Sequence, residues 1–574
     1  MNALILLGVP ALPFLLAVLI AAAPQPALRR LVPWVAFPAL ALAALAPTGK
    51  QAELPWLLTG LELGVDPVGR MFLLLTAALW LAAAFYSRAD RRTDPHPRSF
   101  DVFFLLAMSG NLGLVLAQDA VAFYLFFTLM SLSSWGLVIH YRTPEAWHAG
   151  KLYLILAVLG EMALFAGLVM AIHQAGATSL TAIAAARPEG LGLALLVIGL
   201  GLKAGMLPLH FWLPLAHPAA PVPASAVLSG AMIKAGLLGW LRVLPLDAAG
   251  HAPLGDILVL LGLAAAFFGA LAGVLQRRPK TILAYSSISQ MGLMTTGVGL
   301  ALLLPAAREW LIAAVAVYAL HHGLAKGALF LSVGLVDRLP PQAWQRFGLL
   351  ALLVLPALAL AGLPWTSGAV AKVLLKAPLY TAELAGWRAH VETALALAAV
   401  GTTLLMLRFL FRLRGQMAVG TTPPETTRWL PWALLAAMSL ALPLAGAAIA
   451  LTLEAGAVPL PVNLALVWPP LAGLALAALA WALFRRRRAP TIPEGDIAGL
   501  FHLLVLFTHW LHDRAGPLRD LRFHPRLRAR GQRFLRQARH RLERGELRLT
   551  RWETLSLLYA ASVIALYLAL AWAP

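Results

Sequence analysis

The sequence contains no cysteine. This absence excludes disulfide bonds, thiolate zinc sites and cysteine-ligated iron–sulfur clusters on this chain. Charge is also scarce, because 12% of the 574 residues are charged, whereas a soluble domain has about 25%. The sequence has neither a Walker phosphate loop nor an HExxH zinc motif. We therefore expect no bound cofactor, no metal site and no enzymatic active site of its own.

Hydrophobic residues are abundant instead. They make up 60% of the sequence, and its mean hydropathy is +0.79. Apolar runs recur from end to end, and each is long enough to cross a bilayer core of about 30 Å. This pattern predicts an all-α polytopic membrane protein with about sixteen transmembrane helices, beginning near residues 3, 31, 68, 101, 119, 150, 191, 222, 255, 281, 310, 346, 390, 429, 463 and 553.

Basic residues are distributed unevenly among the predicted loops. Loops after odd-numbered spans hold most of the clusters, among them Arg29–Arg30, Arg277–Arg278 and the block at 485–488. Loops after even-numbered spans carry two basic residues at most. Because basic loops remain on the cytoplasmic side, both termini are expected on the outer side of the cell inner (plasma) membrane.

The stretch 485–551 is the most basic part of the chain, with seventeen arginines against six acidic residues. Nucleic-acid binding is disfavoured, because the stretch lies between two predicted spans and has few interleaved aromatics. We expect a basic amphipathic segment that contacts anionic lipid headgroups or an acidic partner subunit. A final span, 553–574, follows it.

Lysine is rare, with eight residues against 37 arginines. Half of the lysines lie inside apolar runs, namely Lys203, Lys234, Lys326 and Lys372. An arginine guanidinium does not release its proton at accessible pH, whereas a buried lysine ammonium can do so. This partition predicts a proton pathway at these positions.

Five further titratable residues lie at comparable depth: Glu161, His210, His217, His321 and His322. His322 and Lys326 are four residues apart and share one helical face, where a water could link them. The alternative is that each lysine extends to an interface or closes a structural ion pair. Because charges inside a bilayer usually line a polar interior, the whole set favours an ion path.

Two of the lysines are next to helix-breaking residues. Lys203 precedes "GMLP", and Lys372 follows "AGLPWTSG". Proline and glycine in these stretches leave backbone carbonyls unpaired, which a membrane tolerates only beside a cavity or a protein partner. The sequence therefore predicts broken helices at the seventh and twelfth spans, as in many transport sites.

Four segments together resemble a known family. They are "KAGMLPLHFWLPLAHPAAPVPASAVLSGAMIKAG" (203–236), "KTILAYSSISQMG" (280–292), "HHGLAKGALFL" (321–331) and "AGLPWTSGAVAK" (361–372). They are similar to the antiporter-like membrane subunits of respiratory complex I, Mrp-type cation/proton antiporters and group 4 hydrogenases. The resemblance covers roughly residues 60–415.

The resemblance implies two inverted five-helix repeats, at about 101–243 and 255–412. The N-terminal spans 1–100 precede them, and two further spans in 429–484 follow. It also implies a midplane chain of ionisable residues. In that chain Lys203 matches the lysine of the first broken helix, and Lys234 the bridging lysine of the eighth span. His322 and Lys326 match the pair of the eleventh span, and Lys372 the last ionisable residue of the twelfth.

One position departs from the family pattern. Family members usually carry a glutamate in the fifth span, where "LFFTLMSLSS" places Thr128. The acid expected to pair with Lys203 is therefore missing. Glu161, in "AVLGEMALF" of the sixth span, could replace it; the alternative is a local hydrogen bond within the bundle.

These observations favour a proton- or sodium/proton-translocating subunit of a multisubunit Mrp-like or complex I-like assembly, working with other membrane subunits. Two alternatives remain open. The chain could be the membrane partner of an energy-coupled uptake complex, for example for inorganic carbon. It could also be a structural membrane-arm subunit with an incompetent channel, which Thr128 would explain. The residues leave the transported ion and the energy source open.

Overall fold

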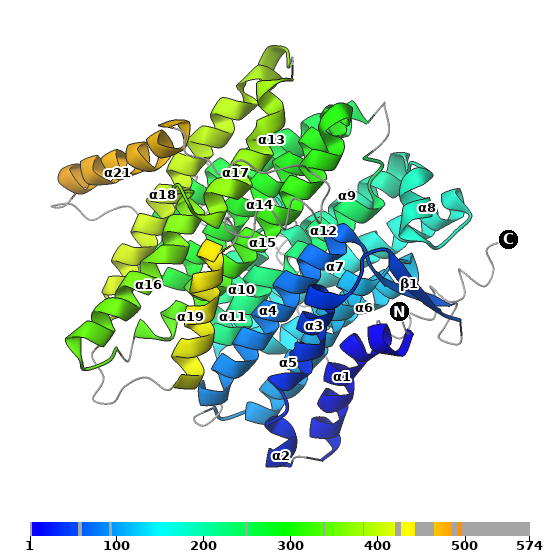
Figure 1. The fold of residues 1–574 in the computed structure, drawn as a ribbon, viewed down its shortest axis with the longest axis horizontal. Coiled ribbons are helices and arrows are strands. Elements are labelled where there is room, and N and C mark those ends of the chain that lie inside the picture. Colours follow the sequence, from blue (N-terminus) through cyan, green and yellow to red (C-terminus); the bar gives the residue numbers. More distant parts are fainter. Residues whose placement is uncertain are drawn as a thin grey trace, which may run out of the picture. The chain divides into compact units, whose positions relative to one another are not determined.

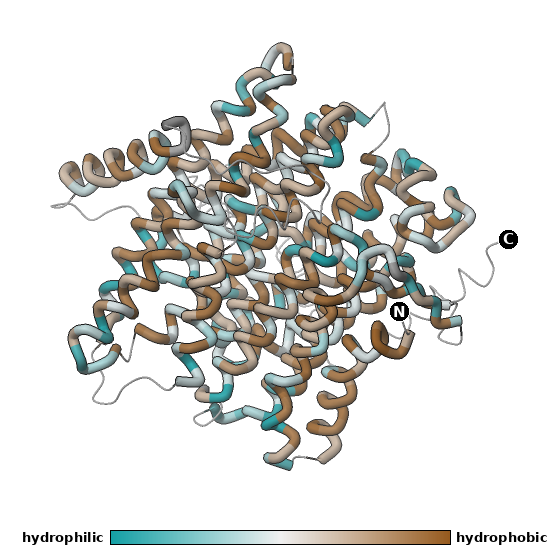
Figure 2. Tube along the Cα trace, in the orientation of Figure 1, coloured by the Kyte–Doolittle hydropathy of each residue, from teal (hydrophilic) through white to brown (hydrophobic). Residues whose placement is uncertain are grey.

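The structure is a computed structural model. It describes residues 3–23, 25–55, 60–90, 94–246, 251–336, 339–382, 384–418, 426–441, 464–484, 492 and 494. The predicted basic segment 485–551, apart from residues 492 and 494, and the predicted span 553–574 lie outside the described residues. Most of the long helices run roughly parallel or antiparallel to one another (Figure 1), and Figure 2 shows them mostly hydrophobic along their lengths.

The N-terminal part combines helices with one hairpin. Its helices are α1 (Ala3–Ala22), α2 (Pro26–Arg29), a 3-10 turn (Trp34–Ala36), α3 (Phe37–Leu45) and α4 (Pro67–Asp90). Strands β1 (Lys50–Leu54) and β2 (Leu61–Val65) pair antiparallel, with Lys50 opposite Val65.

The next five predicted spans are all helical, and the fourth of them is broken. They comprise α5 (Pro97–Leu116), α6 (Ala120–Val138), α7 (Pro144–Ala175), the short surface helix α8 (Leu180–Ala185), the broken pair α9 (Gly190–Ala204) and α10 (Trp212–Ala219), and finally α11 (Val222–Val227), a π-helical turn (Leu228–Met232) and α12 (Lys234–Val243).

The second set of five repeats this plan. It comprises α13 (Ala252–Val274), α14 (Pro279–Leu303), a 3-10 turn (Pro305–Ala307), α15 (Arg308–Val333), the broken pair α16 (Ala343–Ala361) and α17 (Ser367–Lys376), 3-10 turns at Ala377–Tyr380 and Gly386–His390, and α18 (Val391–Arg414). Helices α19 (Thr426–Ala441) and α21 (Leu464–Phe484) follow. The breaks fall at the predicted seventh and twelfth spans.

Described helices begin close to the predicted starts of the first fifteen spans, from residue 3 to residue 463. Within the described residues, 10 helices are long and apolar enough to cross a membrane, and three shorter apolar helices lie at Trp34–Leu45, Gly190–Ala204 and Val467–Leu483. The prediction of an all-α polytopic membrane protein is confirmed. The boundaries of the repeats stay a prediction.

The helix ends define two faces. On one face, here called the hairpin face, β2 bonds to the α5–α6 turn through an isolated bridge between Leu63 and Ala117. Helices α13, α15 and α18 also begin on this face, whereas α5 begins on the other. The two five-helix sets therefore run through the bundle in opposite senses. The opposite face, here called the basic face, holds the ion pair between Arg29 and Asp101.

The helices that carry the predicted site residues are the most enclosed. Every residue in the apolar window of α15 is buried, and nearly all of the window from Val222 to Val243 is buried. By contrast, less than half of the apolar windows of α1 and α16 is buried. Burial of hydrophobic side chains thus places α15 and α11–α12 at the centre of the bundle.

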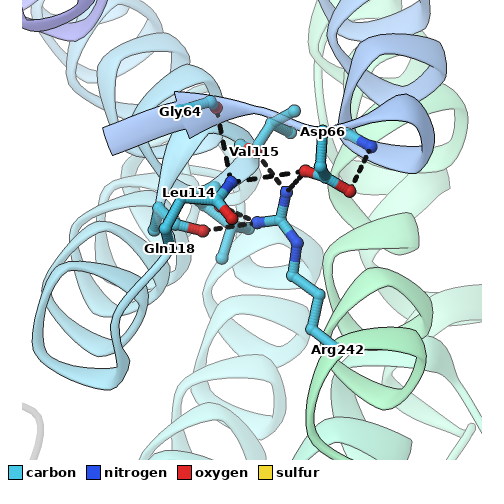
Figure 3. A network of polar contacts seen from close by, with 8 residues as sticks. Gly64, Asp66, Leu114, Val115, Gln118 and Arg242 are labelled. Carbon is cyan, nitrogen blue, oxygen red and sulfur yellow. Dashed lines mark hydrogen bonds and ion pairs between the residues drawn. The ribbon is translucent and has the colours of Figure 1, made fainter. Parts of the chain in front are cut away.

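A guanidinium joins the hairpin, α5 and α12 on the hairpin face (Figure 3). Arg242 donates to Asp66 Oδ1 at 2.6 Å, to Ala117 O at 2.7 Å and to Val115 O at 2.8 Å. It thereby satisfies carbonyls that the end of α5 leaves open. Burial alone would raise the pKa of the Asp66 carboxyl, but Arg242, Gly69 and Gln118 outweigh it and hold that pKa below its ordinary value.

Removing this guanidinium should destabilise the fold. Arg242→Met leaves the Asp66 carboxylate and the α5 carbonyls without their donor, at a cost of about 3 kcal/mol. The unfolding temperature in detergent should fall measurably. In a double-mutant cycle, Asp66→Asn should add little to Arg242→Met; full additivity would contradict a shared interaction.

Candidate functional site

Four lysines occupy the interior of the two five-helix sets, as predicted. Lys203, Lys234 and Lys326 are 4%, 1% and 0% exposed; Lys372 is partly buried. Each ammonium donates to oxygen atoms of the chain, three of them to backbone carbonyls. Burying such a cation is costly unless oxygens replace its hydration shell. The position of each lysine site therefore depends on which oxygen atoms the fold leaves available to accept from an ammonium.

Lys203 lies in the last turn of α9, where the first broken helix ends. Gly205 ends α9 in the left-handed conformation, with φ +74°. The ammonium donates to Ser131 Oγ of α6 at 3.1 Å and to the Tyr153 hydroxyl of α7 at 3.0 Å. Tyr153 in turn donates to the Ser131 carbonyl at 2.8 Å. Lys203 thus joins α6, α7 and α9.

Glu161 lies near the same ammonium. The Ser131 hydroxyl, the Lys203 ammonium and the Thr128 hydroxyl are the groups that act on its carboxyl. Its Oε1 atom makes no hydrogen bond to any described residue. The acid of the sixth span therefore lies beside position 128, where the family usually has its glutamate.

The π-helical turn before α12 creates the site of Lys234. In this turn the Ile233 amide donates to Leu228 O, five residues earlier. The widened turn frees the Ser229 carbonyl, which accepts a hydrogen bond from the Lys234 ammonium at 2.6 Å. Single π turns are common at functional sites.

Lys326 belongs to the second five-helix set, close to its contact with the first set. Its ammonium donates to Leu283 O of α14 at 2.6 Å, and the Ser287 hydroxyl donates to that carbonyl at 2.9 Å. Ser287 Oγ is 2.7 Å from Ser229 Oγ in the π turn. The carbonyls that accept hydrogen bonds from Lys234 and Lys326 are therefore linked through the contact between Ser229 and Ser287.

The histidines differ in their surroundings. His321 bonds to Ser367 Oγ at 2.7 Å, at the start of α17. Neither ring nitrogen of His322 or of His217 has a hydrogen-bond partner among the described residues. Lys234 and Lys326 act electrostatically on both rings. His322 and Lys326 therefore make no direct hydrogen bond to each other, and their link through a water stays a prediction.

His217 and His210 also make ring contacts. The His217 ring stacks on Phe330 at 4.6 Å, whereas the His210 ring packs edge-on against Phe268 at 5.1 Å. His217 therefore belongs to the cluster around Lys234 and Lys326. His210 lies in the break between α9 and α10, next to Phe268 of α13.

Lys372 reaches back to the second helix break. Its ammonium donates to Leu360 O at 2.9 Å and Ala361 O at 2.8 Å, two carbonyls at the C-terminus of α16. A cation is favoured there because carbonyls without intrahelical partners carry partial negative charge. Gly362, with φ +84°, ends α16.

Gly362 also makes room for the ammonium, since an added Cβ would lie 2.8 Å from Lys372 Nζ. Gly362→Ala should therefore displace Lys372 and reduce ion flux about tenfold, besides costing about 1 kcal/mol of backbone strain. Gly386→Ala is the matched control, because Gly386 has φ +61° and open space around it. Flux and unfolding temperature should separate them: equal flux in the two variants would contradict the assignment.

Sequence reasoning missed the polar residues that connect these sites. Besides Ser131, Tyr153 and the two serines, Tyr318 donates to Gln290 Oε1 at 2.9 Å, and Gln290 donates to Thr402 Oγ1 at 3.0 Å. Ser287 and Gln290 stand in "KTILAYSSISQMG", which carried part of the resemblance. Their polarity inside a span was the available signal.

Comparison with known proteins gives a family model. Residues 117–395 match the model described as NADH:quinone oxidoreductase/Mrp antiporter, TM. The matched range includes the helices that carry all nine predicted site residues.

Two curated relatives are similar over a large part of the chain. Hydrogenase-4 component B of Escherichia coli (strain K12) is 30% identical over 330 residues, covering 55% of this chain and 48% of the relative. The putative antiporter subunit mnhA2 of Staphylococcus aureus (strain MSSA476) is 29% identical over 393 residues, covering 63% of this chain and 48% of the relative. The chain therefore spans about half the length of these relatives.

Two solved structures share the fold. The Mrp complex from Dietzia sp. DQ12-45-1b aligns with a TM-score of 0.69 at 22% identity, covering 93% of this chain and 63% of that chain. The membrane-bound sulfane sulfur reductase (MBS), an archaeal respiratory membrane complex, aligns with a TM-score of 0.63 at 19% identity, covering 83% of this chain and 99% of that chain.

The fold and the buried lysines define a polytopic helical membrane protein with two broken helices around a row of ionisable side chains. Together with the matching family model and the similar relatives, they show that residues 117–395 of the chain belong to the antiporter-like membrane subunit family. The resemblance recognised in the sequence is confirmed.

Proposed function

We propose that the chain is the ion-translocating subunit of a multisubunit membrane complex, moving protons, or sodium against protons, along its interior lysines. The row from Lys203 through Lys234 and Lys326 to Lys372 carries this proposal. Arginine would serve equally well as a purely structural cation, and most basic residues of this chain are arginines. Lysine at all four interior positions allows proton release.

The contacts suggest a role for each group. Lys203, with Glu161 beside it, accepts the proton in the first five-helix set, and Lys234 passes it to the second. Lys326 receives it across the Ser229–Ser287 contact, with His322, His321 and His217 around it. Lys372 releases it at the second helix break. His210 remains a member of the path only by its depth, next to the break after α9.

The partners follow from the same comparison. The relatives include a hydrogenase component and an antiporter subunit, and the solved structures are multisubunit complexes. We propose that other membrane subunits bind this chain and that its basic segment, 485–551, contacts anionic lipids. The basic face would then lie on the cytoplasmic side of the inner (plasma) membrane, and both termini would lie on its outer side.

Purification of the tagged chain in mild detergent tests this assignment. Membrane subunits of an ion-translocating complex should copurify in fixed stoichiometry and be identified by mass spectrometry. Companion antiporter subunits, a redox arm or a soluble enzyme would distinguish the antiporter, respiratory and uptake versions. A stable chain that purifies alone would contradict the proposal.

A further inference from the structure

A second lysine lies one helical turn after Lys372 and is absent from the path described so far. Lys376 is 8% exposed, and its ammonium bonds to Glu392 Oε1 at 2.7 Å. It also lies over the Tyr380 ring, 5.9 Å from its centre. Glu392 stands in the first turn of α18, on the hairpin face, and its side chain is 34% exposed. The ion pair thus joins a buried ammonium to a partly exposed carboxylate.

The two lysines share one small cavity. The cavity has a volume of about 30 Å³, which is room for about two water molecules. Its polar lining comes from Lys372, Lys376 and Tyr318, and Gly362 and Ala396 also border it. Lys372 therefore shares this cavity with the lysine of the Lys376–Glu392 ion pair.

The pair has features that a purely structural tie does not require. The hairpin face already has another ion pair that fastens the start of α18, between Arg388 and Asp256 at 2.6 Å. Lys376 instead places its charge four residues from Lys372, where the two like charges repel each other. The Glu392 carboxylate offsets this repulsion by binding the Lys376 ammonium, and loss of this bond would leave Lys376 without its partner beside the cavity.

We propose that Lys376 and Glu392 are further residues of the ion path and form its gate on the hairpin face, with their ion pair formed in this structure. The proposal rests on the proposed function, because it assigns the exit of the same path. It predicts that the cavity opens to solvent when the ion pair is broken, whether or not an ion is moving.

The natural absence of cysteine allows a direct test. Ala396→Cys places one thiol on the cavity wall, at a residue that is 5% exposed. The chain is kept in its purified complex and reconstituted in liposomes, and its reaction with a small charged thiosulfonate reagent is followed by the mass of this chain. We expect slow labelling, and labelling about tenfold faster when Glu392→Gln is added, as for loss of about 1.4 kcal/mol.

Two further variants separate gating from general loosening. Asp256→Asn breaks the neighbouring pair and should leave labelling slow. The exchange Lys376→Glu with Glu392→Lys restores a pair and should return labelling toward the slow rate. Equal acceleration by Asp256→Asn, or no acceleration by Glu392→Gln, would overturn the proposal. Because labelling requires no transport, these outcomes are independent of whether the complex moves ions.

Discussion

Lys326→Arg should abolish ion flux while the complex still assembles. The variant keeps a positive charge next to Leu283 O, where Lys326 donates at 2.6 Å, but a guanidinium does not release its proton. If Lys326 transfers protons, flux should fall at least about 100-fold, in the range expected for loss of a group that transfers a proton. Proton uptake into liposomes containing the purified complex measures it.

Two comparisons guard against a packing effect, since Lys326 is fully buried. Lys326→Gln adds no bulk and should lose flux equally. Lys151→Arg, on α7 outside the lysine row, should keep it. Wild-type flux in an assembled Lys326→Arg complex would show that this lysine is only a fixed charge.

Glu161→Gln should give the second largest effect. A carboxylate near an ammonium favours its protonated form, whereas burial favours the neutral form, and transfer requires the two to stay close in energy. Replacing the acid by an amide of the same size removes the ionisable group beside Lys203, and flux should fall at least about tenfold. Glu145→Gln is the matched control, because that acid lies at the other end of α7 and bonds to Arg278.

Thr128→Glu in the Glu161→Gln background tests whether the sixth-span acid replaces the missing fifth-span acid. Thr128 lies near the Glu161 carboxyl in this structure, so a glutamate at 128 should restore an ionisable acid close to Lys203. Flux should recover in part. A stable double variant without recovery would mean that Glu161 acts elsewhere than on Lys203.

Much of the fold could be predicted from the sequence, because a bilayer requires about twenty apolar residues for each helical crossing. The breaks were predictable for a related reason. Glycine and proline near Lys203 and Lys372 interrupt the two helices. Lys372 donates to carbonyls left open by its break, whereas Lys203 donates to hydroxyls of α6 and α7. The α9–α10 and α16–α17 breaks were predictable because glycine and proline interrupt the helix at their own place in the sequence.

The connections between the lysines could not be predicted, because they depend on contacts between distant segments. Ser229 and Ser287 meet only when α14 packs beside the π turn, and no local pattern predicts that turn. Lys376 could be taken for a surface lysine, since its partner Glu392 lies beyond the loop that ends the twelfth span. The same limit applied to Glu161, whose proximity to Thr128 required the α6–α7 packing.

The most direct test of the lysine path is ion flux through the complex with and without Lys234, which interacts with the groups of both five-helix sets. Liposomes carrying the complex with either the wild-type chain or Lys234→Gln are given an imposed ion gradient, and proton- and sodium-sensitive dyes report both ions. The account predicts flux of at least one ion for the wild type and the rate of empty liposomes for Lys234→Gln. Equal flux in both assembled complexes, or none in either, would contradict it.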